Sequence, residues 1–515
     1  MKSQMKHRFS EVPSVDIPRS RFNRSHSVKT TFDAGWLVPI LIDEALPGDT
    51  FRCEMAGFAR LSTPIFPIMD NMVMDTFFFA VPVRILWDNW KKFMGEQIDP
   101  GDSIDYTVPI VNNLNNAANQ SIWDYFGIPT KVAAVIELNA LVPRAYNLIW
   151  NEWFRDQNLQ ESVSVPRTDG PDDENLYTLL RRGKRHDYFT SCLPFLQKGD
   201  AVLLSLGTSA PVSASEEIAY YGSALPGPLL AADDGLSISG NYFEASVSTD
   251  GGFPIAIGTA DLSSAVGPTV NELRQAVQVQ RLLERDARAG TRYTEIVASH
   301  FGVTSSDARM QRPEYLGGGS SPVIVSPIAR TDSSPGQLGA IGTAAFKGHG
   351  FVKSFTEHCV IIGLVNVRAD LTYQEGLDRM WSRQTRYDFY WPSLAHIGEQ
   401  AVLNKEIYLD AATIGAGTDE DVFGYQERFA EYRYKPSKIT GKFRSNDTGT
   451  LDSWHLGIEF GAQPTLDATF IQENPPVDRV IVTATEPHFV FDSFISMDCV
   501  RPMPTYAIPG LIDHF

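Results

Sequence analysis

The chain has 515 residues, and its 43% hydrophobic and 21% charged residues are typical of a globular protein, which excludes a disordered or collagen-like chain. With 44 Lys and Arg against 62 Asp and Glu, the net charge is −18, so a protein that coats nucleic acid with its whole surface is also excluded. At roughly 150 residues per domain, the length allows about three domains. The 39 glycines, 32 prolines and 30 phenylalanines favour strands and turns over a helical bundle.

Residues 1–30 are a basic segment on an acidic chain, with seven cations and two acids. Because Pro13 and Pro18 disfavour a continuous helix, we expect an extended arm. Phe9 and Phe22 lie between the cations, so the arm can follow a phosphate backbone while a ring stacks on a base. Alternatively, the arm crosses onto a neighbouring subunit and pairs with its acidic surface, and we expect a combination of both roles. The candidate DNA-binding residues are Lys2, Lys6, Arg8, Arg19, Arg21, Arg24 and Lys29.

Apolar patterns predict a sheet in the next part of the chain. Residues 51–55 alternate between apolar and charged side chains, which indicates a half-buried strand. Met72–Val81 is almost wholly apolar and predicts a strand buried on both faces. Helical spacing predicts a short helix within residues 86–94 and another within Ala140–Phe154, while Asp169–Asn175 is expected to be an acidic loop.

A composition shift follows Lys198. From Gly199 to Leu273 the chain has no Lys or Arg in 75 residues but has nine acids, and we expect short strands and loops outside the main core. Two interpretations stay open: an ordinary acidic surface lobe, or an insertion that faces solvent and a partner.

The remainder predicts two helices and then mostly strands. Thr269 and Glu272 form a capping-box pattern for a helix that runs through Arg288 and ends at Gly290, and a second helix covers residues 293–301. Residues 317–344 are expected to be loop. The predicted later strands are Glu357–Val367, Lys405–Leu409, Ser437–Phe443, Trp454–Phe460, Arg479–Thr485 and His488–Ser496. Strands early and late, with helices and loops between them, indicate a mainly β fold: an antiparallel sandwich or jelly roll with long loop and helix insertions.

The four cysteines lie far apart in the sequence, which indicates reduced core residues rather than disulfides or a metal clip. The N-terminus has no apolar stretch typical of a secretory signal, and no apolar run is long enough for a membrane helix. We therefore expect a soluble protein made in a reducing cytoplasm, without membrane insertion.

Catalytic and metal-binding signatures are missing from the sequence. It contains no HExxH, GxSxG or phosphate-binding P-loop pattern, and the spacing of His349, His358 and Cys359 matches no standard metal site. Residues 418–421 could bind Ca²⁺, although a solvated loop is favoured. We expect no catalytic residue, no metal and no cofactor. Because sequence cannot show the carboxylate separations of a glycosidase, a jelly-roll carbohydrate-binding or carbohydrate-active protein remains the alternative.

Several long segments, in the same order along the chain, resemble the major capsid protein of the Microviridae, small icosahedral phages with single-stranded DNA, and in particular of the gokushoviruses. These segments are Val12–Asp33, Leu46–Thr50, Met69–Glu96, Asp286–Tyr293, Ser299–Leu316, Phe429–Ser445, Phe470–Arg479 and Val500–Phe515. Residues 199–273 are the least familiar part.

The resemblance implies an eight-stranded antiparallel jelly roll, formed here by residues 31–198 and 274–515. It further implies a structural protein, not an enzyme, of which sixty copies build a T=1 icosahedral shell around a circular single-stranded DNA genome. The implied partners are a small basic DNA-packaging protein, a scaffolding protein and a host surface receptor, with assembly in the bacterial host cytoplasm. Residues 199–273 are the candidate for the surface protrusion that such phages carry at the three-fold axes.

Overall fold

The computed structural model describes residues 18–202, 269–303, 311–329, 338–410 and 419–506, with six three-residue strands between residues 212 and 260. Two compact units are present: Met1–Leu196 with Thr291–Phe515, and Gln197–Gly290. The smaller unit contains α4 (Val270–Arg288) and the short strands β9 (Val212–Ala214), β10 (Ala219–Tyr221), β11 (Ser237–Ser239), β12 (Tyr242–Glu244), β13 (Phe253–Ile255) and β14 (Gly258–Ala260).

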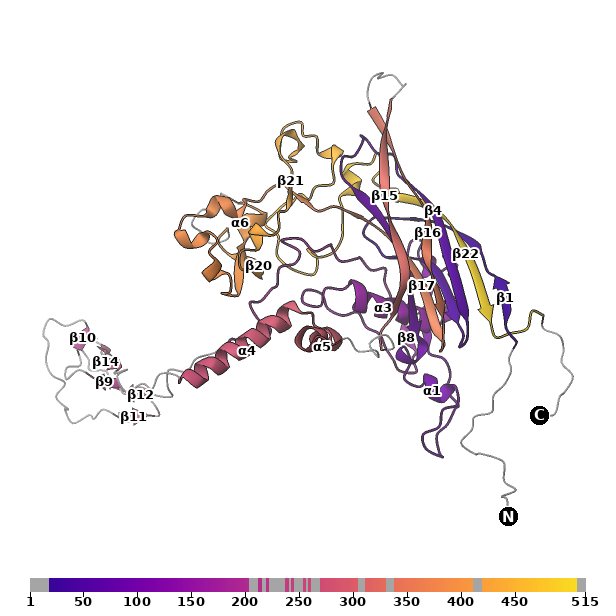
Figure 1. Ribbon diagram of the computed structural model, residues 1–515, viewed down its shortest axis with the longest axis horizontal. Coiled ribbons are helices and arrows are strands. Elements are labelled where there is room, and N and C mark those ends of the chain that lie inside the picture. Colours follow the sequence, from indigo (N-terminus) through magenta and orange to yellow (C-terminus); the bar gives the residue numbers. More distant parts are fainter. Residues whose placement is uncertain are drawn as a thin grey trace, which may run out of the picture. The chain divides into compact units, whose positions relative to one another are not determined.

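One curled antiparallel sheet of nine strands organises the larger unit (Figure 1). Its strands are β1 (Ser20–Asn23), β2 (His26–Phe32), β3 (Val38–Ala45), β4 (Thr50–Leu61), β5 (Met72–Pro82), β15 (Glu314–Ala329), β16 (Leu338–Ser354), β17 (Cys359–Ala369) and β22 (Phe489–Arg501). The order is β1-β22-β4-β16-β15-β5-β17-β3, and β2 also pairs with β22. The mainly β class is confirmed and the sheet is consistent with a jelly roll. The count of eight strands is not confirmed, because β1 and β2 pair with successive parts of β22.

The strand β15 joins the two halves of this sheet. Its first part, Glu314–Val323, pairs with β5, and its second part, Ile324–Ala329, pairs with β16. The prediction of a loop over residues 317–344 is therefore wrong for residues 317–329 and 338–344, and its middle part, 330–337, lies outside the described residues. The glycines that suggested a loop permit close approach instead: a Cβ on Gly317, Gly318 or Gly319 would lie within 3.0 Å of neighbouring backbone or of the His349 ring.

Apolar side chains cover both faces of β5 and β17. One face contributes Met74, Phe78 and Ile361 to the core inside the curl of the sheet. The other face contributes Phe79 and Ile362 to a second core, which packs against the helical segment 141–154 (Figure 1). The predicted strand at Met72–Val81, buried on both faces, is thereby confirmed.

Most of the predicted helices are confirmed. The segment Ala140–Phe154 contains α3 (Leu141–Ile149) and a π-helical turn, η2 (Trp150–Phe154), whereas residues 86–94 hold only the single turn α1 (Trp90–Phe93). The helix α4 has the expected capping box, because Thr269 and Glu272 bond each other's backbone N–H groups. The helix α5 (Tyr293–Phe301) ends at Gly302, whose φ is +68°. Two further helical turns are α2 (Ile122–Tyr125) and α6 (Asn404–Ile407).

Four predicted strands are wrong or nearly so. Lys405–Leu409 overlaps α6, Ser437–Phe443 holds only the two-residue strand β21 (Ser437–Lys438), and Trp454–Phe460 and Arg479–Thr485 are irregular. Tertiary hydrogen bonds replace strand partners here, since the Arg479 guanidinium donates to the carbonyl oxygens of His455 at 3.1 Å and Gly457 at 2.8 Å.

The remaining small strands are β6 (Ile110–Leu114), β7 (Ile136–Asn139), β8 (Asp172–Asp173), β18 (Thr372–Tyr373), β19 (Glu399–Leu403) and β20 (Val422–Glu427).

The acidic segment 169–175 is not simply a solvated loop. Asp172 is buried and accepts two hydrogen bonds of 2.7 Å from the Arg144 guanidinium, which is itself fully buried. The Tyr177 hydroxyl donates to the same carboxylate at 2.6 Å. This bidentate pair fastens the segment to α3.

All four cysteines are buried and unpaired, as expected for reduced core residues. Burial raises the pKa of the Cys53 thiol to about 12, so it stays protonated at neutral pH. Among the described residues, no helix combines the length and the apolar character needed to cross a membrane.

Asp75, on β5, links three segments through charged hydrogen bonds. Its carboxylate accepts from Arg182 at 2.5 Å, Arg368 at 2.8 Å and the Ser320 hydroxyl at 2.5 Å. Burial alone would raise the pKa of Asp75, but the hydrogen bonds from Ser320 and Arg182 and the charge of Arg182 hold it below its usual value. The carboxylate is therefore ionised in the folded protein and balances two guanidinium groups.

The close approach at Gly319 gives a first prediction. Gly319→Ala should lower the stability of the fold by about 1–3 kcal/mol, because the added Cβ overlaps the His349 ring. Gly101→Ala is the matched control, since a Cβ there meets nothing within 4 Å, and its stability should stay within about 0.5 kcal/mol of wild type. Urea unfolding followed by circular dichroism measures both, and equal transitions for the two variants would contradict the close-packing argument.

A second prediction concerns Asp75→Asn. Removing the charge takes away the buried carboxylate that Arg182 and Arg368 share, so the variant should lose about 3–5 kcal/mol at pH 7. Because the folded pKa of Asp75 lies below its usual 3.8, the carboxylate stabilises the wild type above that pH and loses this effect as the pH falls through the folded pKa. The difference between wild type and variant should therefore shrink in acid.

Urea unfolding at pH 7 and at pH 3 tests this expectation, with the exposed Asp88→Asn as control. A constant difference between wild type and D75N at both pH values would show that the ionised carboxylate is not the stabilising group.

Candidate functional site: a basic and aromatic pocket

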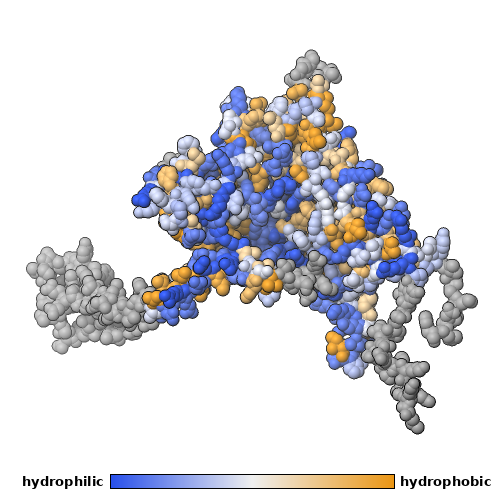
Figure 2. All heavy atoms as spheres, in the orientation of Figure 1, coloured by the Kyte–Doolittle hydropathy of each residue, from blue (hydrophilic) through white to orange (hydrophobic). Residues whose placement is uncertain are grey.

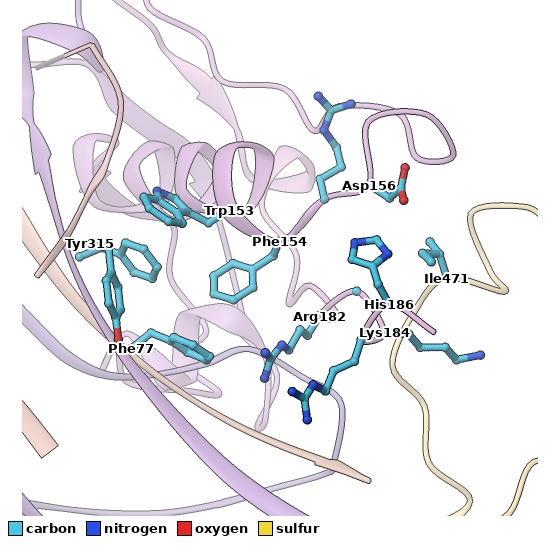
Figure 3. A pocket seen from close by; sticks show the side chains of 13 residues that line it. Phe77, Trp153, Phe154, Asp156, Arg182, Lys184, His186, Tyr315 and Ile471 are labelled. Carbon is cyan, nitrogen blue, oxygen red and sulfur yellow. The ribbon is translucent and has the colours of Figure 1, made fainter. Parts of the chain in front are cut away.

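A cavity of about 550 Å³ opens on the larger unit beside β5. Figure 3 shows rings gathered on one side of it and cationic side chains on the other. The rings are Phe77, Phe79, Trp153, Phe154 and Tyr315, and the basic residues are Arg155, Arg182, Lys184, Arg185 and His186. Asp156 is the one acid that lines this pocket.

Regular elements hold the rings in place. Phe77 and Phe79 project from β5, and the π-helical turn η2 presents Trp153 and Phe154. A π turn at the end of a helix is a common feature of functional sites, because it redirects the side chains that follow. The Trp153 indole donates to the carbonyl oxygen of Pro313 at 2.9 Å, and the Tyr315 ring packs against Phe79 with centroids 5.6 Å apart. Trp153 and Tyr315 remain 38% and 42% exposed.

The cations of the pocket come from one segment, residues 181–186, and from the end of the π turn. Arg182 is neutralised by Asp75, and Lys184 lies over the Phe470 ring at 4.5 Å. Arg185 and His186 are exposed, and Arg185 forms no ion pair with any residue that the structure describes. Arg155 donates to the carbonyl oxygen of Gln160 at 2.9 Å, while its Nε has no partner among the described residues.

Burial disfavours the charged form of two of these cations, although carboxylates lie near both; those near Arg155 are Glu152, Glu161 and Asp156. Burial lowers the pKa of Lys184, although the carboxylates of Glu473 and Asp187 act in the opposite direction. Burial also lowers the pKa of Arg155, and the nearby charge of Arg292 lowers it further. An anion that entered the pocket would reverse both effects, so the pocket favours a negatively charged group next to a flat ring.

The candidate cations of the N-terminal arm lie elsewhere on the larger unit. Lys2, Lys6 and Arg8 fall outside the described residues. Arg21 pairs with Asp498 at 2.5 Å, Arg24 with Asp43 at 2.5 Å and Lys29 with Asp492 at 2.7 Å, while Arg19 donates to the carbonyl oxygen of Gly48 at 2.6 Å. The described part of the arm is therefore tied to its own sheet, with Arg21 and Lys29 side chains still 70% and 74% exposed.

The basic segment of the pocket was not among the predicted site residues. The signal was present, because residues 181–186 (RRGKRH) hold four Lys or Arg and one His in six positions. The rings around it are distant in sequence, so the sequence alone does not associate them with this segment.

His349 is a core residue: its ring nitrogens bond Thr76 at 2.9 Å and Ser321 at 3.1 Å, and burial lowers its pKa. Within the described residues, no group of three His, Cys, Asp or Glu side chains could hold a metal ion.

Comparisons with known proteins point to one family. The family model described as "Capsid protein (F protein)" matches residues 10–511. Capsid protein VP1 of Bdellovibrio phage phiMH2K is 47% identical, over 99% of this chain and 98% of that protein. Capsid protein VP1 of Chlamydia phage 1 is 44% identical with the same coverage, and Capsid protein VP1 of Spiroplasma virus 4 is 35% identical over 98% and 97% of the two chains.

These matches cover almost the whole sequence, and all of them name a structural protein rather than an enzyme. The carbohydrate-active alternative is thereby set aside, and the resemblance to the major capsid proteins of the Microviridae is confirmed. Since a capsid is built from many copies of its subunit, the chain is a multimer-forming component of the virion. With an antiparallel sheet consistent with a jelly roll and near full-length similarity to three viral shell proteins, the chain belongs to the capsid protein (F protein) family.

Proposed function

We propose that sixty copies of this chain form a T=1 icosahedral shell around a circular single-stranded DNA genome, and that the basic and aromatic pocket contacts that genome. The observation that carries the DNA contact is the position of Arg185, which has no ion pair among the described residues, in a pocket with the exposed rings of Trp153 and Tyr315. Assembly takes place in the bacterial cytoplasm, with a scaffolding protein and with a small basic protein that neutralises phosphates which this acidic chain leaves unpaired.

The pocket suits single-stranded rather than double-stranded DNA. A stacked base of a duplex offers no free face, whereas an unpaired base can lie on Trp153 or Tyr315 while Arg185 and Lys184 approach the phosphates. Stacking does not depend on the identity of the base, and a shell that encloses a whole genome needs contacts of that kind.

The arm cations remain part of this proposal. Arg21 and Lys29 pair with carboxylates at the surface, where solvent and salt screen such ion pairs and they contribute little to the stability of the fold. A phosphate can therefore compete for them, and the described arm contributes cations without leaving its place on β22.

The pocket gives a third prediction. Arg185→Gln should weaken binding to a fluorescent oligothymidylate and reduce the slope of log K against log salt by about 0.7, the value for one lost phosphate contact on a single strand. Tyr315→Ala should weaken binding by about 1–3 kcal/mol with an unchanged slope, because it removes stacking and no charge. Fluorescence anisotropy from 50 to 300 mM salt measures both.

Lys91→Gln is the matched control, since Lys91 is exposed on α1 outside the pocket. The same titration with the triple variant R19A/R21A/R24A separates the arm from the pocket. If R185Q and K91Q bound with the same affinity and slope, the pocket would not be a DNA contact.

We further propose that residues 199–273 form the surface protrusion at the three-fold axes and contact the host. Two observations support this assignment: the stretch has no Lys or Arg, and it belongs to a separate compact unit, Gln197–Gly290. An insertion that folds apart from the main sheet can vary and project without disturbing the shell.

Deletion of residues 210–255 gives a fourth prediction. Particles should still assemble, because the deletion leaves the nine-stranded sheet intact, but host adsorption should fall to background. Gradient sedimentation measures assembly and a cell-binding assay measures adsorption. Normal adsorption of the shortened particles would contradict the assignment.

A further inference from the structure

Eight large side chains form an exposed surface on the larger unit, which we call the aromatic–arginine face. They are Met380, Trp381, Tyr387, Phe389, Tyr390, Trp391, Tyr432 and Tyr434, and their exposed fractions range from 39% for Trp391 to 70% for Trp381. Four of them lie in the short 3₁₀ turns η6 (Arg379–Ser382), η7 (Arg386–Asp388) and η10 (Ala430–Tyr432), and the other four flank these turns and η8 (Pro392–Leu394). Soluble monomers rarely expose so many large apolar groups together.

The face is held in one arrangement before any partner binds. The Arg383 guanidinium lies over Tyr432 at 4.3 Å and over Phe389 at 5.7 Å, and Arg386 lies over Trp391 at 4.8 Å. The Trp391 indole donates to the carbonyl oxygen of Arg386 at 3.0 Å. Rings fixed in this way lose little conformational entropy when they are covered.

Three cations of this face and its edge already pair with carboxylates. Arg383 pairs with Glu431 at 3.1 Å, Arg433 with Glu427 at 2.5 Å and Lys438 with Asp378 at 2.6 Å. Arg386 forms no ion pair with a residue that the structure describes and lies over Trp391. Nucleic-acid affinity comes from cations that replace counterions at phosphates, and these four cations lie against carboxylates or a ring. The exposed rings of the face therefore suit a protein partner.

A hollow of about 250 Å³ lies at the edge of the face, lined in part by Met380, Arg383, Tyr432 and Tyr434. A hollow of this size accepts one large side chain. Exposed Trp, Tyr and Arg residues around such a hollow are the usual composition of the energetic centre of a protein–protein interface.

We infer that the aromatic–arginine face is a contact between copies of this chain in the shell. The partner is a second copy because the chain belongs to a capsid family, whose members bury their surfaces against one another. The contact forms when Trp381 and Tyr387, the most exposed rings of η6 and η7, pack on the neighbouring subunit.

The double variant W381A/Y387A tests this contact. The side chains of Trp381 and Tyr387 are 70% and 66% exposed, so the subunit should fold and melt within about 2 °C of wild type. Particles recovered on sucrose gradients from phage-producing cells should fall at least about tenfold, as expected for the loss of two interface anchors. Oligothymidylate binding by the subunit should stay unchanged, which separates this contact from the proposed DNA pocket.

The matched control is W381F/Y387F, which keeps both rings and should assemble within about twofold of wild type. Wild-type particle yield from W381A/Y387A would overturn the inference. Particles that assemble normally but fail to adsorb to cells would also overturn it and place the face on the host side of the shell. If the double variant melted early, the single variants W381A and Y387A, each with its melting temperature, would decide the question.

Discussion

The larger unit depends on the close approach of β15 to the strands on either side of it. This strand pairs with β5 along its first part and with β16 along its second, so it connects the two halves of the sheet. Gly317–Gly319 make this possible, because without side chains they let neighbouring backbone and the His349 ring approach closely. The same strand places Ser320 on the Asp75 carboxylate and Tyr315 at the pocket. Beyond β5, the strand β15 continues as a two-stranded ribbon with β16. Ile324 and Ile328 on β15 and Leu338 on β16 are exposed there, and Figure 2 shows the apolar end of this ribbon.

Sequence patterns predicted the elements whose own periodicity decides their structure. Three elements are of this kind: the strands at Met72–Val81 and at residues 51–55, and the capped helix α4. In each of them, residues close together in the sequence determine the buried faces or the capping box. The loop prediction for residues 317–344 failed because glycine and serine serve tight sheet packing as well as turns. The apolar residues of Trp454–Phe460 predict a strand, but the Arg479 side chain bonds two of its backbone carbonyl oxygens in place of a strand partner.

The candidate site was less predictable, because the residues that form it come from five separate parts of the chain. The basic run at 181–186 was visible in the sequence, but only folding brings Phe77 and Tyr315 beside it. The two cation-rich surfaces also look alike in sequence. In each surface some cations have carboxylate partners, as Arg383 has Glu431 and Arg182 has Asp75, whereas Arg185 has none among the described residues.

The position of β22 in the sheet has a consequence for how the chain is made. Lys29 on β2 and Asp492 on β22 form an ion pair across 463 residues of sequence, and β4 also pairs with β22. At a translation rate of roughly 5–20 residues per second, the N-terminal strands wait about 20 to 90 s for this partner. During that time one edge of β4 has no neighbour, so nascent chains need protection from each other. A ribosome that stops early releases a chain without β22, and such a chain lacks the strand that joins β1 and β2 to the sheet. Only chains translated through β22 can therefore hold β1 and β2 on the sheet.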